Sequence, residues 1–396
     1  MNRFKILIAT FTFPPNKDGV AEAASVMARA YLKHGWEVEI ATEPTIPPRE
    51  EKTWEGMPIH EFRISGTPHS RYPFRGETDA YRDFLRSGSW DVVIFHAYSW
   101  PTYLAAPHLD EIRGKKILVS HGYGALIWVP SRNFPFGLGS LLDSLVRSVV
   151  MLGWLRKINR VVYLSPRRDL KAFFDHALAR LIRHPGIRVI PNGIDPEVRG
   201  RFGESFRKAV GAVPGQIVFL CVANYSQRKD QGYAVRAFRE AAIPDSLLVF
   251  IGSEFNDAYR AFRAEDATWE SASPPGRVVW LEKQDRAATL DALAGCDVFV
   301  LSASVEAHPI ALLEAMREGK PWIAREAGCI REMAGGLCVS SEKAMAQGMR
   351  RLAENTSLRA ATGREGAAAV ARDYTVGGYT DSYCRLVEEL VAEAGS

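Results

Sequence analysis

The sequence predicts an α/β protein with two doubly wound parallel sheets. Short β-branched runs alternate with longer helical patterns along the chain, which is the order that parallel sheets covered by helices on both faces require. The runs fall into two series of about equal length, separated by the turn-rich segment 191–196, Pro-Asn-Gly-Ile-Asp-Pro. A chain of 396 residues is long enough for two domains that each bury a core.

The first series of expected strands lies between residues 5 and 190. A helical pattern over 21–34 follows its first strand and ends at Gly35, a residue suited to a left-handed helix cap. The amino-terminal apolar run is short and soon meets Pro14 and Pro15, so a strand is expected there rather than a signal peptide. The expected strands of this series are 5–10, 37–41, 91–97, 116–120, 161–164 and 188–190.

The second series begins at residue 217 and is followed by a helical pattern over 378–394. An amino-terminal domain over 1–195 and a second domain over 196–374 are therefore expected. Ligands of open parallel sheets bind at the carboxyl ends of the strands, so the site is expected in the cleft between the two domains. The expected strands of this series are 217–223, 247–252, 278–281, 298–302, 322–324 and 337–339.

The composition is that of an ordinary globular protein, with 47% hydrophobic and 24% charged residues. The formal net charge of +4 is too small for a dedicated nucleic-acid binder, so no nucleic-acid partner is expected. Residues 131–190 are locally basic, with 11 Lys and Arg against 3 Asp and Glu. Such a segment suits an anionic membrane surface or an acceptor that carries phosphates, although a solvated face explains it equally well.

Cysteine spacing and hydropathy indicate a reduced protein that does not span a membrane. The five cysteines are widely separated and show no pairing pattern and no metal-binding spacing. No apolar stretch reaches the roughly 20 residues that a membrane-spanning helix needs. The expected location is the cytoplasm, and peripheral attachment to the inner face of the plasma membrane stays open.

The segment 299–316 is the most informative about function. An apolar strand ends, Glu306 lies in the following loop, Pro309 opens a helix and Glu314 follows within that helix. Proline is favoured at the first helical position. The unpaired N–H groups of a helix start and the positive end of its dipole bind phosphate. Since the two acids can bind different parts of one ligand, the segment suggests a nucleotide sugar.

Two further loops carry candidate phosphate contacts. Arg228 and Lys229 follow the first strand of the second domain and can neutralise a diphosphate, although a solvated Arg-Lys pair is common in loops. Gly19 and Val20 open a helix after the first strand, where the backbone can approach a ligand closely; an ordinary capping turn is the alternative. The G-x-G-x-x-G fingerprint is absent, which disfavours a nicotinamide cofactor.

His121 stands between the end of an expected strand and a glycine-rich turn, so its imidazole can reach into a cleft. A structural histidine is the alternative. The other eight histidines show no metal-ligand spacing, and no Asp-x-Asp motif is present. No metal and no cofactor are therefore expected.

Taken together, these segments resemble the retaining glycosyltransferases of family four, also called group 1. The resemblance covers nearly the whole chain and rests on Glu306-x7-Glu314 with its Pro-x3-Leu-Glu-Ala-Met tail, on the segment 191–195 and on Lys229. The segment 319–336 is similar to the next strand and loop of the family. The resemblance implies the GT-B fold of two facing Rossmann-like domains, with the helix at 375–396 crossing back to the first domain.

For the donor, the resemblance implies contacts in the second domain. Glu306 is expected to bind the hydroxyls of the sugar and Glu314 the ribose of the nucleotide. The loop around Gln284 is expected to face the base. The groups implied for the diphosphate are Arg228, Lys229 and the backbone amides of Ile310 and Ala311.

On the first domain, Gly19 and the neighbouring Val20 are expected to meet the same phosphates, and His121 matches the histidine that the family places near the sugar and the acceptor. The chain departs from the family where Asp18 precedes a single glycine, where Asn224 replaces a common arginine, where Ala307-His308 replaces a glycine-led pair and where Cys329 replaces a glycine. Asn224 and His308 are kept as candidate substrate-binding residues.

The resulting hypothesis is a metal-independent transfer of a sugar from a nucleotide-diphosphate sugar to a saccharide or lipid-linked acceptor, with retention of configuration. A UDP-sugar is favoured and a GDP-sugar is next, in bacterial cell-envelope polysaccharide or glycoconjugate synthesis. The expected catalytic residues are Lys229, Arg228, Glu306 and His121. Two alternatives stay open: a nucleotide-sugar epimerase or hydrolase of the same fold, and a non-catalytic nucleotide-sugar-binding subunit.

Overall fold

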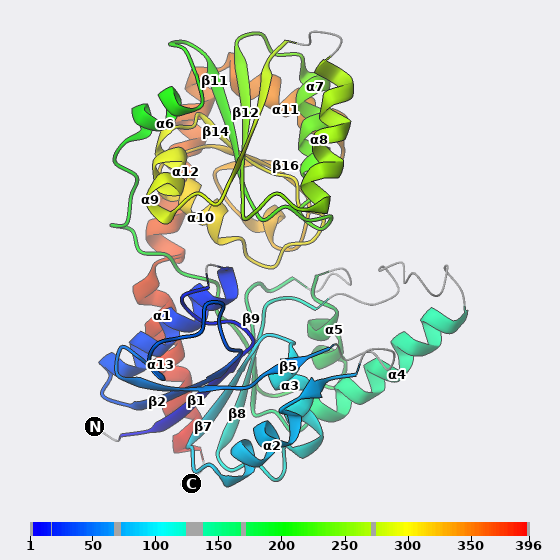
Figure 1. The fold of residues 1–396 in the computed structure, drawn as a ribbon, viewed down its shortest axis with the longest axis vertical. Coiled ribbons are helices and arrows are strands. Elements are labelled where there is room, and N and C mark those ends of the chain that lie inside the picture. Colours follow the sequence, from blue (N-terminus) through cyan, green and yellow to red (C-terminus); the bar gives the residue numbers. More distant parts are fainter. Residues whose placement is uncertain are drawn as a thin grey trace. The chain divides into compact units, whose positions relative to one another are not determined.

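The computed structural model describes residues 3–16, 18–66, 73–123, 138–167, 172–270 and 275–393. These residues form two compact units, which Figure 1 shows as ribbons. Unit 1 comprises Met1–Asn192 and Gly377–Ser396, and unit 2 comprises Gly193–Val376. Each unit contains its own sheet with helices on both faces.

Unit 1 is built on an eight-stranded sheet with the order β10-β9-β8-β7-β1-β2-β4-β3. All neighbours are parallel except β3, which pairs antiparallel with β4 at one edge. The strands are β1 (Lys5–Thr10), β2 (Glu37–Thr42), β3 (Thr53–Trp54), β4 (Met57–Glu61), β7 (Val92–His96), β8 (Lys115–Ser120), β9 (Arg160–Tyr163) and β10 (Ile187–Val189), with β5 (Ile64–Ser65) and β6 (Arg75–Gly76) in a separate pair. The helices are α1 (Gly19–Lys33), α2 (Thr78–Ser87), α3 (Trp100–Ala105), η1 (Ala106–His108), α4 (Leu138–Leu155), α5 (Phe174–Leu181) and α13 (Val376–Ala392).

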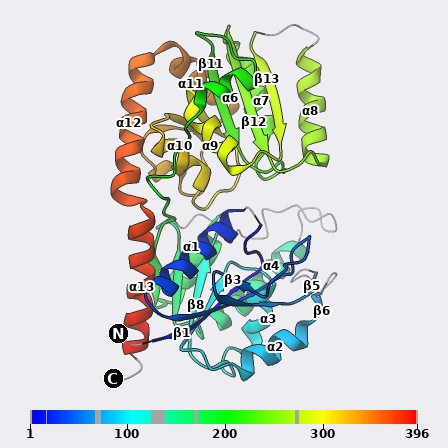
Figure 2. The same cartoon turned by 60° about the vertical axis from the view of Figure 1, so that its left-hand side comes forward.

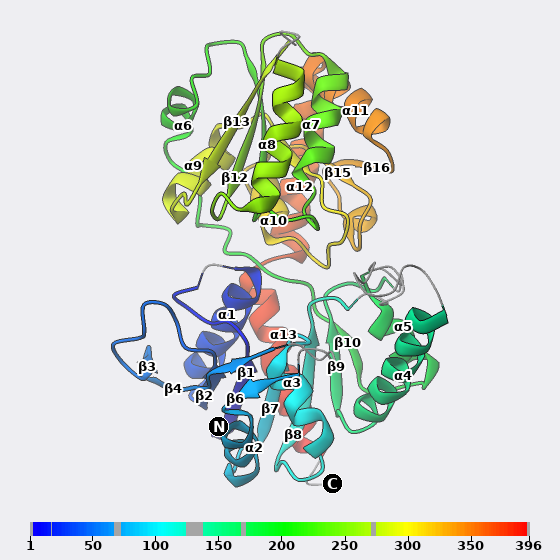
Figure 3. The ribbon, with the colours of Figure 1, turned by 45° about the vertical axis from the view of Figure 1, so that its right-hand side comes forward.

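The central strand β1 buries both of its faces, because side chains alternate across a strand. Ile6 and Ile8 pack with α1 and α13 on one face, and Leu7 and Ala9 pack with α2, α3 and α4 on the other. All four side chains are fully buried. Such an apolar run is typical of a parallel strand covered on both sides. Figure 3 shows α4 and α5 side by side next to β9 and β10.

Helix α13 completes the core of unit 1 although it comes last in the chain. Tyr379, Tyr383 and Val387 belong to the same buried cluster as Ile6 and Ile8 of β1. The Tyr379 hydroxyl also donates a hydrogen bond of 3.2 Å to a backbone carbonyl of α1. Figure 2 shows α13 beside α1 on one side of the sheet.

Unit 2 is built on a six-stranded parallel sheet with the order β13-β12-β11-β14-β15-β16. Val218 and Leu220 of its central strand pack with α9 and α10, while Phe219 and Cys221 pack with α7 and α11. The strands are β11 (Ile217–Val222), β12 (Ser246–Gly252), β13 (Arg277–Glu282), β14 (Val298–Leu301), β15 (Trp322–Arg325) and β16 (Gly336–Val339). The helices are α6 (Gly203–Ala209), α7 (Gln231–Ala241), α8 (Asp257–Glu270), α9 (Arg286–Gly295), α10 (Ile310–Arg317), η3 (Ile330–Glu332), α11 (Glu342–Glu354) and α12 (Thr356–Asp373).

The two sheets confirm the fold class that the sequence predicts. All twelve expected strands are present, and their ends differ from the expected ones by no more than one residue. Gly35 has φ +82° after the first helix, as its capping role requires. The short strands β3 to β6 were not expected. Strand β4 contains Pro58, which has no backbone N–H to donate. A proline within an apolar run argues against a strand, so β4 was not predicted from the sequence.

None of the described helices has the length and hydropathy of a membrane span. All five cysteines carry free thiols; Cys338 is exposed and the other four are buried. Those four therefore act as small apolar side chains in the packing of each unit.

Candidate active site

The strand order of unit 2 reverses between β11 and β14, which are neighbours in the sheet. In doubly wound sheets, ligands bind beside the loops that follow the strands at such a reversal. Two hydrogen bonds join these loops: the Ser304 amide donates to the Arg228 carbonyl at 2.9 Å, and the Ser302 hydroxyl donates to the Lys229 carbonyl at 2.9 Å. The loop after β11 is thereby held against the loop after β14.

Lys229 and Glu306 form an ion pair across this reversal. Both side chains are largely covered, with exposed fractions of 20% for Lys229 and 9% for Glu306. A buried carboxylate that lost its cation would be strongly destabilising, so each charge needs either this partner or a ligand. A molecule that brings a phosphate to Lys229 and hydroxyls to Glu306 can replace the ion pair with two new contacts.

Helix α10 begins directly after the Glu306 loop. Its N-cap is Pro309, with φ −75° and ψ 114°, and no side chain caps this end with a hydrogen bond. Pro309 therefore lies one position before the first helical residue and not at the first helical position that the sequence pattern predicts, because its extended ψ keeps it outside the helix. The amides of Ile310 and Ala311 have no acceptor one turn earlier within the helix, so they and the helix dipole can stabilise an anion.

Glu314 lies one turn further along α10 and is paired with Arg286, the first residue of α9. The side chain of Glu314 is 4% exposed and that of Arg286 is 51% exposed. Arg286 was not among the residues expected from the sequence. Its place just beyond β13, at the same sheet edge as Gln284, was the available signal. Because a ribose diol is a good donor to a carboxylate, a bound nucleoside would compete with Arg286 for Glu314.

The remaining expected residues of unit 2 lie in the loops after β11, β13 and β14. Arg228 and Asn224 are exposed in the loop after β11. Gln284 is also exposed, and its Nε2 donates to a backbone carbonyl two residues earlier at 2.9 Å. His308 is buried and packs edge-on against Tyr374, with ring centroids 5.2 Å apart. Burial lowers the pKa of His308 to about 4, so this imidazole is neutral at pH 7 and adds no positive charge.

In unit 1, the strand order reverses between β1 and β7, and the loop after β1 leads into α1. Asp18 is the N-cap of α1. Its Oδ1 accepts hydrogen bonds from the amides of Val20 at 2.9 Å and Ala21 at 3.0 Å, and its Oδ2 accepts one from the Thr12 hydroxyl at 2.7 Å. A phosphate at this helix start would meet a carboxylate. The phosphate contacts expected for Gly19 and Val20 stay a prediction.

His121 follows β8, and its Nε2 lies 3.1 Å from Nδ1 of His96, the last residue of β7. The ring centroids are 4.4 Å apart with an interplanar angle of 47°. Burial lowers the pKa of His121 to about 4, although the charge of Asp18 acts in the opposite direction. Burial also places the pKa of the fully buried His96 well below its usual value. The sequence analysis missed His96 because a lone histidine in an apolar strand is usually a core residue.

Asp175, in the first turn of α5, supports the turn that carries His121. Its Oδ2 accepts a hydrogen bond of 2.6 Å from the Ser120 hydroxyl, and the Gly122 amide donates to that hydroxyl at 3.3 Å. Asp175 is completely buried. Burial raises the pKa of Asp175 to about 7, while hydrogen bonding by Ser120 and Tyr98 opposes this shift.

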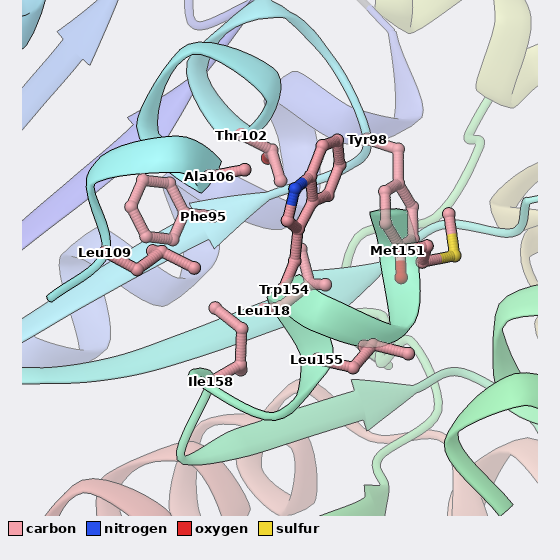
Figure 4. A pocket seen from close by; sticks show the side chains of 10 residues that line it. All are labelled: Phe95, Tyr98, Thr102, Ala106, Leu109, Leu118, Met151, Trp154, Leu155 and Ile158. Carbon is pink, nitrogen blue, oxygen red and sulfur yellow. The ribbon is translucent and has the colours of Figure 1, made fainter. Parts of the chain in front are cut away.

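Two other features of the described residues give no second ligand site. A closed apolar cavity lies among α3, η1 and α4, where Trp154 and Tyr98 line it, as Figure 4 shows. Its volume of about 10 Å³ is room for one water molecule at most. Within the described parts of the chain, no group of three or more His, Cys, Asp or Glu side chains is arranged to hold a metal ion.

Two family models match the sequence, one in each unit. The model described as "Glycosyl transferases group 1" matches residues 203–368, and the model described as "Glycosyl transferase 4-like domain" matches residues 18–193. Together they account for most of both units. Among curated proteins, no sequence matches this chain.

Solved structures of similar fold cover nearly the whole chain. The sucrose-phosphate synthase from Thermosynechococcus elongatus is 17% identical, with a TM-score of 0.79 over 99% of this chain and 100% of its own. Anabaena Alr3699/HepE in complex with UDP-glucose is 15% identical, with a TM-score of 0.76 over 98% and 100%. WaaG, a glycosyltransferase involved in lipopolysaccharide biosynthesis, is 15% identical, with a TM-score of 0.70 over 96% and 99%. These likenesses establish the GT-B fold.

Proposed function

This chain belongs to the group 1 glycosyltransferases of the GT-B fold, and on that premise we propose that it moves a sugar from a nucleoside-diphosphate sugar to a saccharide or lipid-linked acceptor with retention of configuration. One observation carries the proposal: two carboxylate–cation pairs flank the uncapped start of α10 in unit 2. The order of groups along this segment is carboxylate, helix start, carboxylate. That order suits a ligand with hydroxyls at both ends and phosphates between them.

The donor would replace the two ion pairs. The sugar hydroxyls would donate to Glu306 and the ribose hydroxyls to Glu314. Arg286, whose side chain is 51% exposed, would then turn into the solvent. The diphosphate would lie where positive groups converge. Those groups are Arg228, Lys229 and the amides of Ile310 and Ala311.

In the proposed reaction, the bond between the anomeric carbon and the phosphate oxygen breaks and its electron pair stays on the phosphate. The acceptor oxygen bonds to the same face of the anomeric carbon, and its proton passes to the departing phosphate. Lys229, Arg228 and the start of α10 face the oxygen on which negative charge develops, so they stabilise the transition state more than the ground state.

A UDP-sugar is the favoured donor and a GDP-sugar the next. Support comes from Anabaena Alr3699/HepE, whose structures contain UDP-glucose, UDP and glucose, or UDP. Isothermal titration of the purified chain with UDP, GDP and ADP tests this assignment. UDP is expected to bind at least tenfold more tightly than the other two. Equal binding of all three would remove the preference, and no binding of any would contradict the nucleotide-sugar site itself.

The acceptor side is proposed to include a lipid-linked saccharide at an anionic membrane surface, in bacterial envelope glycoconjugate synthesis. Helix α4 carries three exposed apolar side chains, Val146, Val149 and Val150. The exposed Arg156 and Lys157 follow directly after its carboxyl end. Apolar and basic groups of this kind suit insertion at a lipid surface. Of the basic stretch 131–190, residues 131–137 and 168–171 lie outside the described residues.

Vesicle flotation tests the membrane part of the proposal. The chain is expected to float with phosphatidylglycerol vesicles but not with phosphatidylcholine vesicles, and Val149→Glu is expected to weaken flotation. Leu32→Glu is the matched control, because Leu32 is an exposed apolar residue on α1 of unit 1 and lies outside the stretch 131–190. Absence of flotation would leave a soluble saccharide as the acceptor.

Product analysis with donor alone separates the proposed transferase from the two alternatives. Dependence of donor turnover on an added acceptor supports transfer. An epimerised donor, or fast release of free sugar, would instead indicate the epimerase or hydrolase. Tight nucleotide binding without turnover would indicate a non-catalytic binding subunit. This alternative is tested because Asn224 stands where the family commonly has an arginine.

A further inference from the structure

We propose that His96 sets the tautomer of His121, so that His121 presents its Nδ1 as a hydrogen-bond acceptor to a substrate hydroxyl. The substrate part of this inference rests on the proposed function; the tautomer part rests on unit 1 alone. His96 contacts His121 rather than the substrate, so it is a positioning residue. No sequence pattern or family resemblance assigned a role to it.

The sheet itself brings the two rings together. Strands β7 and β8 are parallel neighbours, and His96 lies opposite Val119 in their register. The chain then leaves β8 through Ser120, whose hydroxyl is held by the buried Asp175. His121 therefore starts from a fixed turn, and its ring lies across the end of β7.

The contact engages one particular nitrogen of His121. Its Nε2 lies 3.1 Å from Nδ1 and 3.4 Å from Nε2 of His96. Because Nε2 of His121 lies within 3.4 Å of both nitrogens of the fully buried His96, it is turned inward. Nδ1 is the nitrogen through which His121 can reach a substrate.

Protonation then decides what Nδ1 can do. Both imidazoles are neutral at pH 7, because burial lowers both pKa values. A hydrogen bond between two neutral imidazoles holds one proton, and the nitrogen that carries it fixes the tautomer of both rings. If His121 donates from Nε2 to Nδ1 of His96, both rings carry their proton on Nε2, which is the preferred tautomer of free histidine. The shorter of the two distances agrees with this arrangement.

The tautomer decides whether His121 accepts a hydrogen bond from the substrate or donates one to it. With its proton on Nε2, His121 offers a lone pair at Nδ1 and accepts a hydrogen bond from a hydroxyl. Without His96, the ring can exchange tautomers and rotate, so the acceptor is present only part of the time. The loss is expected in kcat/KM, because it concerns alignment of a substrate hydroxyl and not nucleotide binding in unit 2.

The test combines imidazole nitrogen NMR of the intact chain with kinetics. In the wild type, His121 is expected to carry its proton on Nε2. His96→Leu removes both nitrogens and is expected to give exchanging tautomers at His121 and a roughly tenfold lower kcat/KM, with the UDP dissociation constant unchanged. His96→Asn returns an oxygen near the position of Nδ1. It is expected to restore the Nε2-protonated tautomer of His121 and most of kcat/KM.

His184→Leu is the matched control. His184 is another buried histidine of unit 1, bonded to the Ile158 carbonyl at 2.9 Å and to the Gly186 amide at 3.0 Å. Its loss is expected to lower stability without changing the His121 tautomer.

An Nδ1-protonated His121 in the wild type, or an unchanged tautomer in His96→Leu, would overturn the inference. If His96→Leu does not fold, the tautomer of His121 in the wild type still decides it, because a proton on Nδ1 would contradict the inference. A wild type without transferase activity would refute the proposed function, while the NMR result would still decide the tautomer.

Discussion

The two units use the same edge of the same kind of sheet for groups of opposite character. In unit 2, the reversal point gathers Arg228, Lys229 and the start of α10, which no side chain caps. In unit 1, the start of α1 is closed by the carboxylate of Asp18, and the neighbouring strand end carries the neutral pair of His96 and His121. We therefore expect one sheet edge to bind anions and the other to bind neutral hydroxyls.

This contrast shows that the fold supplies the position of a site, while a few loop residues decide its ligand. Both helix starts have the same backbone amides and the same dipole. An aspartate at the cap of α1 satisfies those amides from within the chain, whereas a proline at the cap of α10 leaves them open. Phosphate recognition is therefore expected at the start of α10 in unit 2 and not at the start of α1 in unit 1.

The largest effect is expected from Lys229→Met, which removes a cation from the anion-binding edge. Without leaving-group stabilisation, kcat should fall about 100-fold, as measured in a donor-turnover assay with saturating donor. Lys208→Met, an exposed lysine on α6 of the same unit, is the control and should leave kcat unchanged. A Lys229 variant with wild-type kcat would remove the contrast between the units.

The next effect concerns the neutral edge of unit 1. Because burial raises the pKa of Asp175 to about 7, the folded protein binds a proton there that the unfolded chain has already released. Stability must then fall as pH rises toward 7. Relative to Asp175→Asn, the wild type should lose about 2 kcal/mol of unfolding free energy between pH 5 and pH 7. Urea unfolding at both pH values checks this, and parallel pH profiles of the two proteins would contradict it.

Glu314→Gln tests the expected ribose contact within unit 2. The substitution keeps the shape but weakens the acceptor for the ribose, so UDP should bind about tenfold more weakly in a calorimetric titration. Glu326→Gln, whose partly buried carboxylate pairs with Arg331 on the same unit, should bind UDP normally. If Glu314→Gln binds UDP as the wild type does, the ribose contact is not at Glu314.

The smallest effect is expected at the cap of α1. In a chain that also carries Lys229→Met, Asp18→Gly would free the amides of Val20 and Ala21 for an anion. Inorganic diphosphate should then raise Tm slightly, whereas Asp18→Asn, which can still cap the helix, should show no such rise. A rise with both variants, or with neither, would mean that the cap does not separate the two units.

The sequence predicted the strands of both units and singled out Lys229, Glu306 and Glu314 in unit 2 because their signals are local. A buried strand, a loop acid and a proline at a helix start lie within a few residues, and Lys229 follows a strand in the same way. Arg286 and His96 could not be predicted in this manner. Arg286 meets Glu314 from 28 residues away, and His96 meets His121 from 25 residues away. Both contacts depend on strand order, which the residue pattern does not contain.

The departure at Asp18 was visible in the sequence, but its meaning was not. A single glycine after an aspartate could equally form a phosphate loop with a nearby acid. Only the three hydrogen bonds of its carboxylate show that Asp18 occupies the helix start itself.

The position of α13 bears on how the chain matures on the ribosome. Tyr379, Tyr383 and Val387 belong to the cluster that covers β1, yet they are synthesised long after it. Domains usually fold in the order in which they are translated. Here all of unit 2 is synthesised before α13, whereas unit 1 lacks part of its apolar core until α13 has been synthesised. Unit 2 is therefore expected to complete its fold before unit 1, which is the reverse of the order of synthesis.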